Sequence, residues 1–111
     1  MTDRCEHFDA IRAVAPSADR CEACAVLGAP WVRLRICLTC GQVGCCEDSR
    51  HAHALAHHLE SGHPMIASLE RDEHWGWCYP HRRYFEPMPG PLPKLPSRFL
   101  RLVRRLARRK P

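Results

Sequence analysis

Cysteine and histidine are the residues of this chain whose spacing points most directly to chemistry. The sequence of 111 residues contains eight of each. Ten of them form five close pairs, Cys5-x-His7, Cys21-x2-Cys24, Cys37-x2-Cys40, His53-x3-His57 and Cys78-x2-His81. Zinc takes four ligands of these two types, and tight turns and helical turns supply such ligands in pairs. The spacing therefore predicts zinc sites, with Cys45 and His63 as further single candidates.

The main alternative to zinc for eight cysteines is a set of disulfide bonds. The N-terminal segment contains acidic residues such as Asp3, Glu6 and Asp9 and no apolar run long enough for a signal peptide. No apolar stretch of about eighteen residues occurs, so we expect no transmembrane segment. These features favour a cytoplasmic, reduced protein, in which cysteines beside histidines bind zinc more often than they form disulfides.

Catalytic zinc sites carry recognisable strings that this sequence lacks, namely H-E-x-x-H and H-x-E with P-C-x-x-C. A nucleophilic cysteine is conceivable at Cys46, which belongs to none of the pairs, but a spare or alternate zinc ligand is the simpler interpretation. The sequence contains no Gly-rich phosphate-binding loop. We therefore expect no catalytic residues and no enzyme activity.

The positioning elements can be predicted from the residues between the pairs. Zinc must stabilise the fold, because three Phe, three Trp and two Tyr give little material for a core. Alternating apolar and basic residues predict a strand over 31–38, and residues 50–61 predict a helix with Asp48 or Ser49 as N-cap and Gly62 as its stop. Residues 65–69 and 75–79 predict a hairpin. The sum is a small zinc-stabilised α+β domain with an antiparallel sheet and one main helix.

Charge divides the chain into a mildly acidic body and a basic end. Residues 1–93 hold nine Arg against twelve acidic residues, a net charge of −3, whereas residues 94–111 hold eight Lys and Arg and a net charge of +8. Proline-rich residues 86–96 predict an extended linker after a domain of residues 1–85. Residues 97–111 place apolar side chains at helical spacing opposite arginines. This basic amphipathic tail could bind nucleic acid or an anionic membrane surface with the zinc body as scaffold, or stay solvated.

Three segments, WVRLRICLTCGQVGCC, HAHALAHHLESGHP and WGWCY, resemble the UBP-type zinc finger of ubiquitin-specific proteases and a histone deacetylase. The resemblance covers roughly residues 5–81 and implies up to three zinc ions in a cross-braced arrangement. Carried onto the matching positions, its ligand sets are Cys5, His7, Cys78 and His81; Cys21, Cys24, Cys45 and His53; and Cys37, Cys40, His57 and His63. His81 stands where three-zinc members have a cysteine, and Cys46 could ligate in place of Cys45.

The resemblance also implies a function, because the family's finger is a non-catalytic module that binds the free C-terminal diglycine of ubiquitin. In the family, an arginine two residues after the cysteine that matches Cys45 meets the terminal carboxylate of the ligand. This chain has Glu47 at that position, followed by Asp48. A carboxylate there repels the ligand's own, so we expect weak or no binding to ubiquitin tails unless Arg33, Arg35 or Arg50 replaces the missing arginine.

The walls of the family's pocket are better preserved than its anchor. Trp77 and Tyr79 match the wall positions, and Trp31 is a candidate third wall, although these side chains could instead pack in the core. We therefore predict a zinc-binding recognition module whose partner is a peptide or protein, such as a free C-terminal tail.

Overall fold

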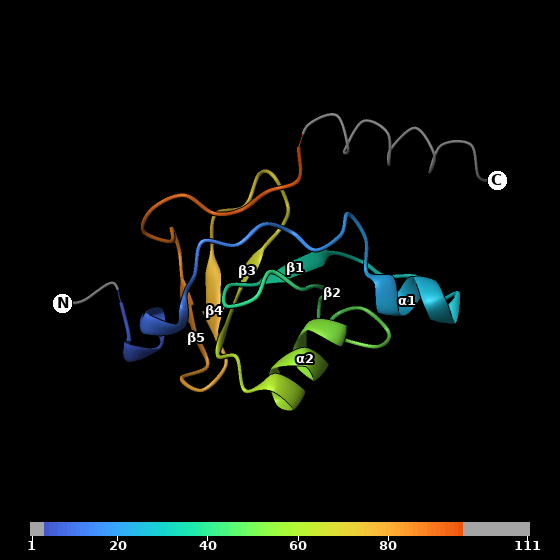
Figure 1. Ribbon diagram of the computed structural model, residues 1–111, viewed down its shortest axis with the longest axis horizontal. Helices are drawn as coiled ribbons and strands as arrows, with labels where there is room; N and C mark the ends of the chain where they lie inside the picture. Colours follow the sequence, from blue (N-terminus) through green and yellow to red (C-terminus); the bar gives the residue numbers. More distant parts are fainter. Residues whose placement is uncertain (1–3, 97–111) are drawn as a thin grey trace.

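The secondary structure confirms an α+β fold built around one antiparallel sheet. The computed structural model describes residues 4–96, so the predicted basic tail of residues 97–111 lies outside the described residues. The strand order is β2-β1-β3-β4-β5, with α2 beside β2 and β1 and with α1 beyond the β2 edge (Figure 1). In chain order the elements are η1 (Glu6–Ala10), α1 (Glu22–Leu27), β1 (Leu34–Cys37), β2 (Val43–Cys45), α2 (His53–Ser61), β3 (Met65–Ser68), β4 (Gly76–Cys78) and β5 (Arg83–Phe85).

The strand predictions locate the centre of the sheet and miss its edges. The strand expected over 31–38 is the shorter β1, and the expected hairpin is formed by β3 and β4, which pair Met65 with Cys78 and Ala67 with Gly76. The edge strands β2 and β5 have three residues each, and α1 has six. Elements this short contain too few repeats for an apolar period to be recognised.

Helix α2 begins later than the sequence pattern suggests and ends where it predicts. Its N-cap is Ala52, which adopts a left-handed conformation with φ 45°, rather than Asp48 or Ser49. The Ser49 hydroxyl instead accepts a hydrogen bond from the backbone N–H of Val32 at 2.8 Å, which ties the loop before α2 to the segment before β1. Gly62 terminates the helix with φ 78°, as predicted. No helix within residues 4–96 is long and apolar enough to cross a membrane.

One face of the sheet carries the hydrophobic core. Alternate side chains of the strands, among them Ile36, Met65 and Phe85, are buried on this face. Phe8 of η1 packs edge-on against Phe85, with ring centroids 4.9 Å apart, and Leu95 joins the same cluster from the other end of the described chain. Both terminal segments of residues 4–96 therefore seal the same face.

The opposite face is only half covered. The strand register places Ile66, Trp77 and Tyr84 side by side across β3, β4 and β5 on this face. Helix α2 packs over the other half at β2, where Gly44 allows a close approach, because a Cβ atom there would lie 2.8 Å from the backbone nitrogen of Ala54. Tyr84 is 61% exposed, so the half formed by β4 and β5 remains open to solvent.

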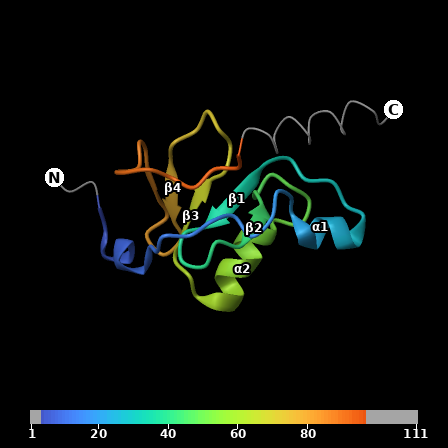
Figure 2. The same cartoon turned by 45° about the horizontal axis from the view of Figure 1, so that its top comes forward.

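Residues 86–96, predicted as a linker beyond the domain, pack against the domain instead. Met88 and Leu95 are buried, with 4% and 8% of their surface exposed. The Lys94 ammonium donates hydrogen bonds of 2.5–2.9 Å to three backbone carbonyls between Ser68 and Glu73, and this segment lies beside the loop that joins β3 to β4 (Figure 2). The boundary expected near residue 85 is therefore too early, because apolar residues between the prolines extend the packed body to Leu95.

Candidate metal centres and binding pocket

The first cysteine–histidine cluster joins the N-terminal segment to the turn after β4. Cys5 and His7 meet Cys78 at the end of β4 and His81 in the turn that follows. The Sγ atom of Cys78 lies 3.3 Å from Nδ1 of His7, 3.4 Å from Nδ1 of His81 and 3.9 Å from Sγ of Cys5. The Glu6 carboxylate lies 3.7 Å from the other ring nitrogen of His81, a position from which carboxylates orient ligating imidazoles.

The second cluster connects α1, β2 and the start of α2. Its Cys21, Cys24 and Cys45 side chains are completely buried, and each Sγ lies 3.3–3.5 Å from Nδ1 of His53. Burial, together with the neighbouring Cys21 and Cys45 thiols, raises the pKa of Cys24 to about 12. A thiol with such a pKa ionises at neutral pH only beside a strong positive charge, so the position of Cys24 in this donor set fits a divalent cation.

The third cluster lies at the other end of α2. Cys37 and Cys40, on either side of the turn after β1, meet His57 and His63. Sγ of Cys37 lies 3.4 Å from Nδ1 of His63, and Sγ of Cys40 lies 3.3 Å from Nε2 of His57. His53 and His57 are one helical turn apart and belong to different clusters, so α2 braces two of them at once.

The internal distances of the clusters match tetrahedral zinc. Ligands at about 2.0–2.3 Å from a tetrahedral ion are about 3.3–3.8 Å from one another. Donor atoms in contact with one another lie 3.1–3.9 Å apart in the first cluster and 3.3–3.7 Å apart in the second. All eight cysteines are free, and the Sγ atoms of Cys24 and Cys45 are 3.7 Å apart, far beyond a disulfide bond of about 2.05 Å. The three clusters therefore suit Zn²⁺, and four protein donors in each leave no open position of the kind that catalytic zinc needs.

The structure brings the twelve expected metal residues together in the three expected groups. It also separates the two adjacent cysteines, because Cys45 belongs to the second cluster, while the Sγ atom of Cys46 lies 3.4 Å from the hydroxyl of Ser49. A strand sends neighbouring side chains to opposite faces, and this alternation is the physical reason that only one of the pair reaches the cluster.

Sequence reasoning does not identify His58, which connects the third cluster to the open face of the sheet. Nδ1 of His58 donates a hydrogen bond to the backbone carbonyl of His63 at 2.7 Å. Its ring stacks on Tyr79, with centroids 4.3 Å apart and an interplanar angle of 11°. His57 and His58 are adjacent in sequence, and no spacing signal distinguishes the ligand from the residue that supports it.

A small cavity of about 130 Å³ lies on the open half of the sheet, between the aromatic side chains of β4 and β5 and the loop after β2. Trp77 and Tyr79 line it, as the sequence predicts. The prediction for Trp31 is wrong, because that side chain packs against the hydrophobic core and does not line the cavity. Trp75 and Tyr84 are the further walls, since alternate residues of β4 share a face and β5 lies beside it.

The cavity contains both signs of charge. Glu47 and Asp48 line it and are exposed, and Arg35 lines it from β1. Tyr79 Oη is buried and has no hydrogen-bond partner among residues 4–96. Burial and then the nearby Glu47 carboxylate raise the pKa of the Tyr79 phenol, so the hydroxyl stays protonated and free to donate or accept a hydrogen bond.

Comparison with known proteins places these observations in a family context. A family model described as the Zn-finger in ubiquitin-hydrolases and other proteins matches residues 21–88. Histone deacetylase 6 of Caenorhabditis elegans is 31% identical in an alignment of 84 residues that covers 72% of this chain and 8% of that protein. The chain therefore spans less than a tenth of this relative's length. The solution NMR structure of protein RPA1320 from Rhodopseudomonas palustris is 48% identical, with a TM-score of 0.70, and the match covers 86% of this chain and 100% of that one.

Proposed function

The chain belongs to the UBP-type zinc-finger family, and from this premise we propose that it is a non-catalytic module that binds a peptide segment of a partner protein in the cavity of Trp77 and Tyr79. The zinc clusters fix the position of α2 relative to the sheet, and the open half of the sheet supplies the binding surface. The free cysteines support a reducing compartment, and we place the protein in the cytoplasm.

The observation that carries this proposal is the position of the aromatic residues. The chain has only eight Phe, Trp and Tyr residues. Four of them, Trp75, Trp77, Tyr79 and Tyr84, line the cavity, while the core takes Phe8 and Phe85. A small domain that leaves half of its aromatic side chains on an open face loses core stability, and exposed clusters of this kind mark interaction sites.

The proposal excludes strong binding to the free diglycine tail of ubiquitin. Glu47, which stands where the family has its arginine, lines the cavity together with Asp48, and this supports repulsion of a ligand carboxylate there. Arg35 also lines the cavity, but its guanidinium lies 3.8 Å from the Glu73 carboxylate and donates to the hydroxyl of Ser68 at 3.3 Å. Because Arg35 is already paired, it is a poor substitute for a free anchoring arginine.

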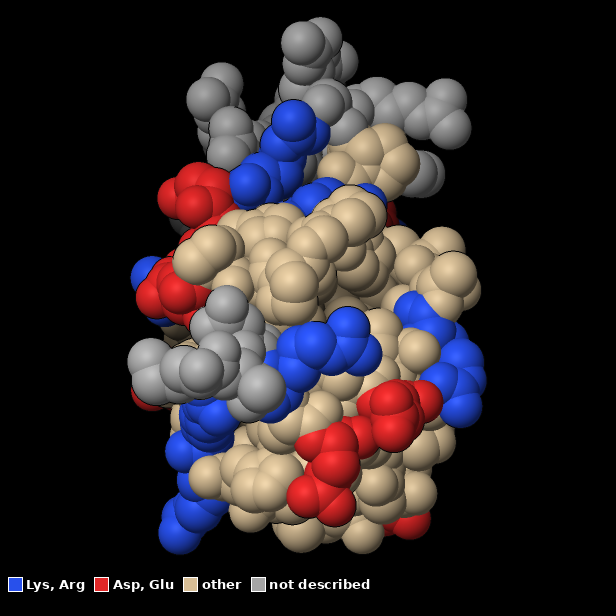
Figure 3. All heavy atoms as spheres, turned by 90° about the vertical axis from the view of Figure 1, so that its left-hand side faces the viewer, with Lys and Arg blue, Asp and Glu red and all other residues tan. Residues whose placement is uncertain are grey.

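Binding through residues 97–111 is the competing function, and the body of the protein gives it no added support. On the face shown in Figure 3, basic and acidic side chains are intermingled and form no continuous basic surface. The described residues 4–96 contain nine Arg and Lys94 against eleven acids, a net charge of −1. Nucleic acid or an anionic membrane would therefore have to be held by the tail alone.

A fluorescence titration separates the two functions, because two of the three tryptophans line the cavity. The zinc-loaded full-length protein is titrated with mixtures of short peptides, some with free and some with blocked ends. We expect Trp77→Leu to abolish the change in emission and the matched Trp31→Leu to retain it, with zinc content checked for both. Binding that survives Trp77→Leu but disappears when the arginines of residues 97–111 are replaced by glutamine would contradict the proposal.

A further inference from the structure

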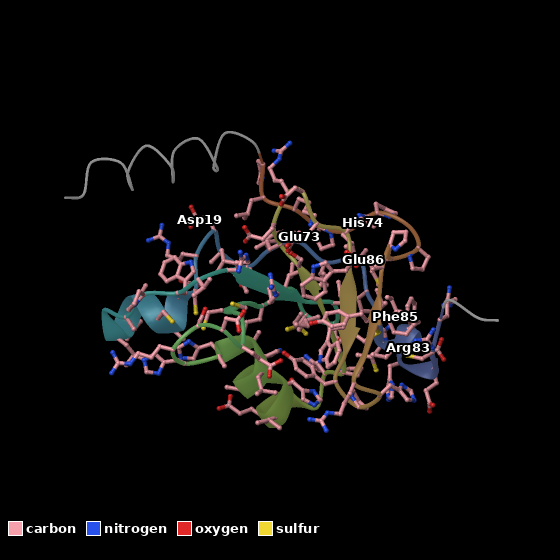
Figure 4. All side chains as sticks on the ribbon, turned by 180° about the vertical axis from the view of Figure 1, so that it is seen from behind. Asp19, Glu73, His74, Arg83, Phe85 and Glu86 are labelled. Carbon is pink, nitrogen blue, oxygen red and sulfur yellow. The ribbon has the colours of Figure 1, made fainter. Side chains whose placement is uncertain are left out.

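The charge of the cavity is determined by which of its charged side chains are already paired. Arg35 is the one basic residue among the described residues that line the cavity. Its Nη1 atom donates a hydrogen bond to the carbonyl of Leu34 at 3.1 Å and lies 3.8 Å from the carboxylate of Glu73. Glu73 lies in the loop between β3 and β4 (Figure 4). Its guanidinium carbon also lies 4.6 Å from the centroid of the Trp75 ring. The positive charge of Arg35 is thus balanced within the protein, and Glu47 and Asp48 leave the cavity with a net negative charge.

The walls of the cavity offer aromatic faces to a positive charge. The rings of Trp77 and Tyr84 are 4.5 Å apart and tilted by 56°, and those of Trp75 and Tyr84 are 5.1 Å apart and nearly perpendicular. The fourth ring, Tyr79, is fixed from behind by stacking on His58. The faces of Trp and Tyr rings attract ammonium groups within about 6 Å of the ring centroid, and Trp attracts them most strongly.

The unpartnered hydroxyl of Tyr79 indicates that a polar group of the ligand completes the site. Tyr79 Oη is buried without a hydrogen-bond partner among residues 4–96, which costs free energy unless a ligand supplies the partner. An unmodified ammonium can donate one N–H to this oxygen and another to the Glu47 carboxylate, and a dimethylated ammonium keeps one N–H for the Tyr79 oxygen while its charge still attracts Glu47. The cavity measures about 130 Å³, below the range of about 300–1,000 Å³ that is typical of sites for whole small molecules, so it suits one side-chain head group.

Building on the proposed function, we propose that the cavity binds the ammonium head group of a lysine side chain of the partner protein, and binds it more tightly when that nitrogen is methylated. Methyl groups weaken the hydration of the ammonium and widen its contact with the aromatic faces, while the positive charge is retained. Glu47 and Asp48 at the rim supply the opposite charge, and they replace the family's selection for a carboxylate by selection for a cation.

The test uses the zinc-loaded full-length protein and four blocked or free short peptides. Three are end-blocked tripeptides with a central lysine that is unmodified, dimethylated or acetylated, and the fourth ends in a free diglycine carboxylate. We expect tryptophan emission to report binding in the order dimethyl-lysine, then lysine, with acetyl-lysine and the diglycine peptide bound weakly or not at all. Acetylation is the decisive comparison, because it removes the charge of the nitrogen and leaves the methylene chain of the lysine unchanged.

Variants at the rim complete the test. Glu47→Gln and Asp48→Asn should each weaken binding of the dimethyl-lysine peptide by about three- to tenfold, as loss of a partly exposed charge contact would. Glu60→Gln removes an exposed carboxylate of α2 that does not line the cavity, and it should leave the affinity unchanged. Native mass spectrometry checks that each variant retains its zinc.

Two results would overturn the inference, and they have different consequences for the proposed function. Tighter binding of the diglycine peptide, strengthened further by Glu47→Gln, would show that the cavity accepts a carboxylate. Peptide binding in the cavity would then stand, but the exclusion of the diglycine tail would be refuted. Equal binding of lysine and acetyl-lysine peptides would show that the cavity does not recognise the positive charge of the side chain. If none of the four peptides binds, the inference fails, and the separate Trp77→Leu titration decides the proposed function.

Discussion

The substitution Gly44→Ala tests whether the contact between β2 and α2 holds the second zinc cluster together. Gly44 precedes Cys45 in β2, and a Cβ atom added to it would lie 2.8 Å from the nitrogen and 3.0 Å from the Cα of Ala54, and 3.1 Å from the carbonyl carbon of His53. All three are backbone atoms of the first turn of α2, so no side chain can rotate away to make room.

The expected effect follows from the displacement needed. Restoring a normal contact of about 3.4 Å requires Ala54 to move by about 0.6 Å, which separates Cys45 from His53 in the same cluster, whereas metal–ligand distances tolerate about 0.2 Å. We expect Gly44→Ala to weaken zinc binding at the second cluster by about tenfold or more, and to lower the free energy of unfolding by about 1–3 kcal/mol, the usual cost of overpacking.

The measurement is a chelator titration followed by native mass spectrometry, with thermal unfolding recorded in parallel. Gly28→Ala is the matched control, since Gly28 has φ 66° and no atom within 4 Å of an added Cβ. It should lower stability by about 1 kcal/mol through backbone strain and keep the zinc affinity of the wild type. A Gly44→Ala protein that retains its zinc up to the same chelator concentration as Gly28→Ala would refute the reasoning.

Three further outcomes are expected. Removal of zinc by a strong chelator, or by acid below about pH 5, should abolish the far-ultraviolet circular dichroism of the fold, because thiolates and neutral imidazoles are needed for binding; an unchanged spectrum of metal-free protein would contradict this. Cys37→Ser should unfold the protein, whereas His81→Ala, at an exposed site, should destabilise it less, and urea titrations of both variants can compare the two effects. A stable Cys37→Ser protein with three zinc ions would contradict the assignment of Cys37 to the third cluster. Lys94→Met should lower the free energy of unfolding by about 2 kcal/mol, because it removes three hydrogen bonds to backbone carbonyls that are partly exposed. No change in the melting temperature would show that residues 86–96 are held by apolar packing alone.

The metal clusters could be predicted from the sequence because their signal is local. Pairs such as Cys21–Cys24 and Cys37–Cys40 can be recognised by their spacing in the sequence, and the family resemblance assigns the remaining donors to clusters. The assignment of Cys45 rather than Cys46 requires the strand β2, which has only three residues and a glycine at its centre. Adjacent residues of a strand point to opposite faces of the sheet, and only the pairing of β2 with β1 determines which face each residue occupies.

The composition of the cavity could be predicted only in part. Trp77 and Tyr79 could be predicted because they flank Cys78, a member of the first cluster, whereas Tyr84 reaches the cavity through the pairing of β4 with β5, a strand of only three residues. Trp75 lies just before β4 and lines the cavity beside Trp77. Trp31 has the same chemistry but belongs to the core. Aromatic residue type alone does not distinguish a wall from core packing, since both environments favour it.

The packing of residues 86–96 could not be predicted from the sequence, for a different reason. Prolines set an extended backbone, which the sequence predicts, but they do not determine whether that backbone is solvated or lies on a surface. Met88 and Leu95 are buried in the core, and the side chain of Met88 lies against Gly76 of β4. Interactions of such long range leave no periodic trace in the local sequence.

The three clusters close chain loops of very different length, and this sets the order in which the protein can assemble. Cys37 and His63 of the third cluster are 26 residues apart, whereas Cys5 and Cys78 of the first are 73 residues apart. Closing the longer loop costs about 1 kcal/mol more chain entropy if the rest of the chain is still disordered. Metal uptake should therefore begin at the two clusters that share α2, and the first cluster should close last, once the sheet has brought the ends of the body together.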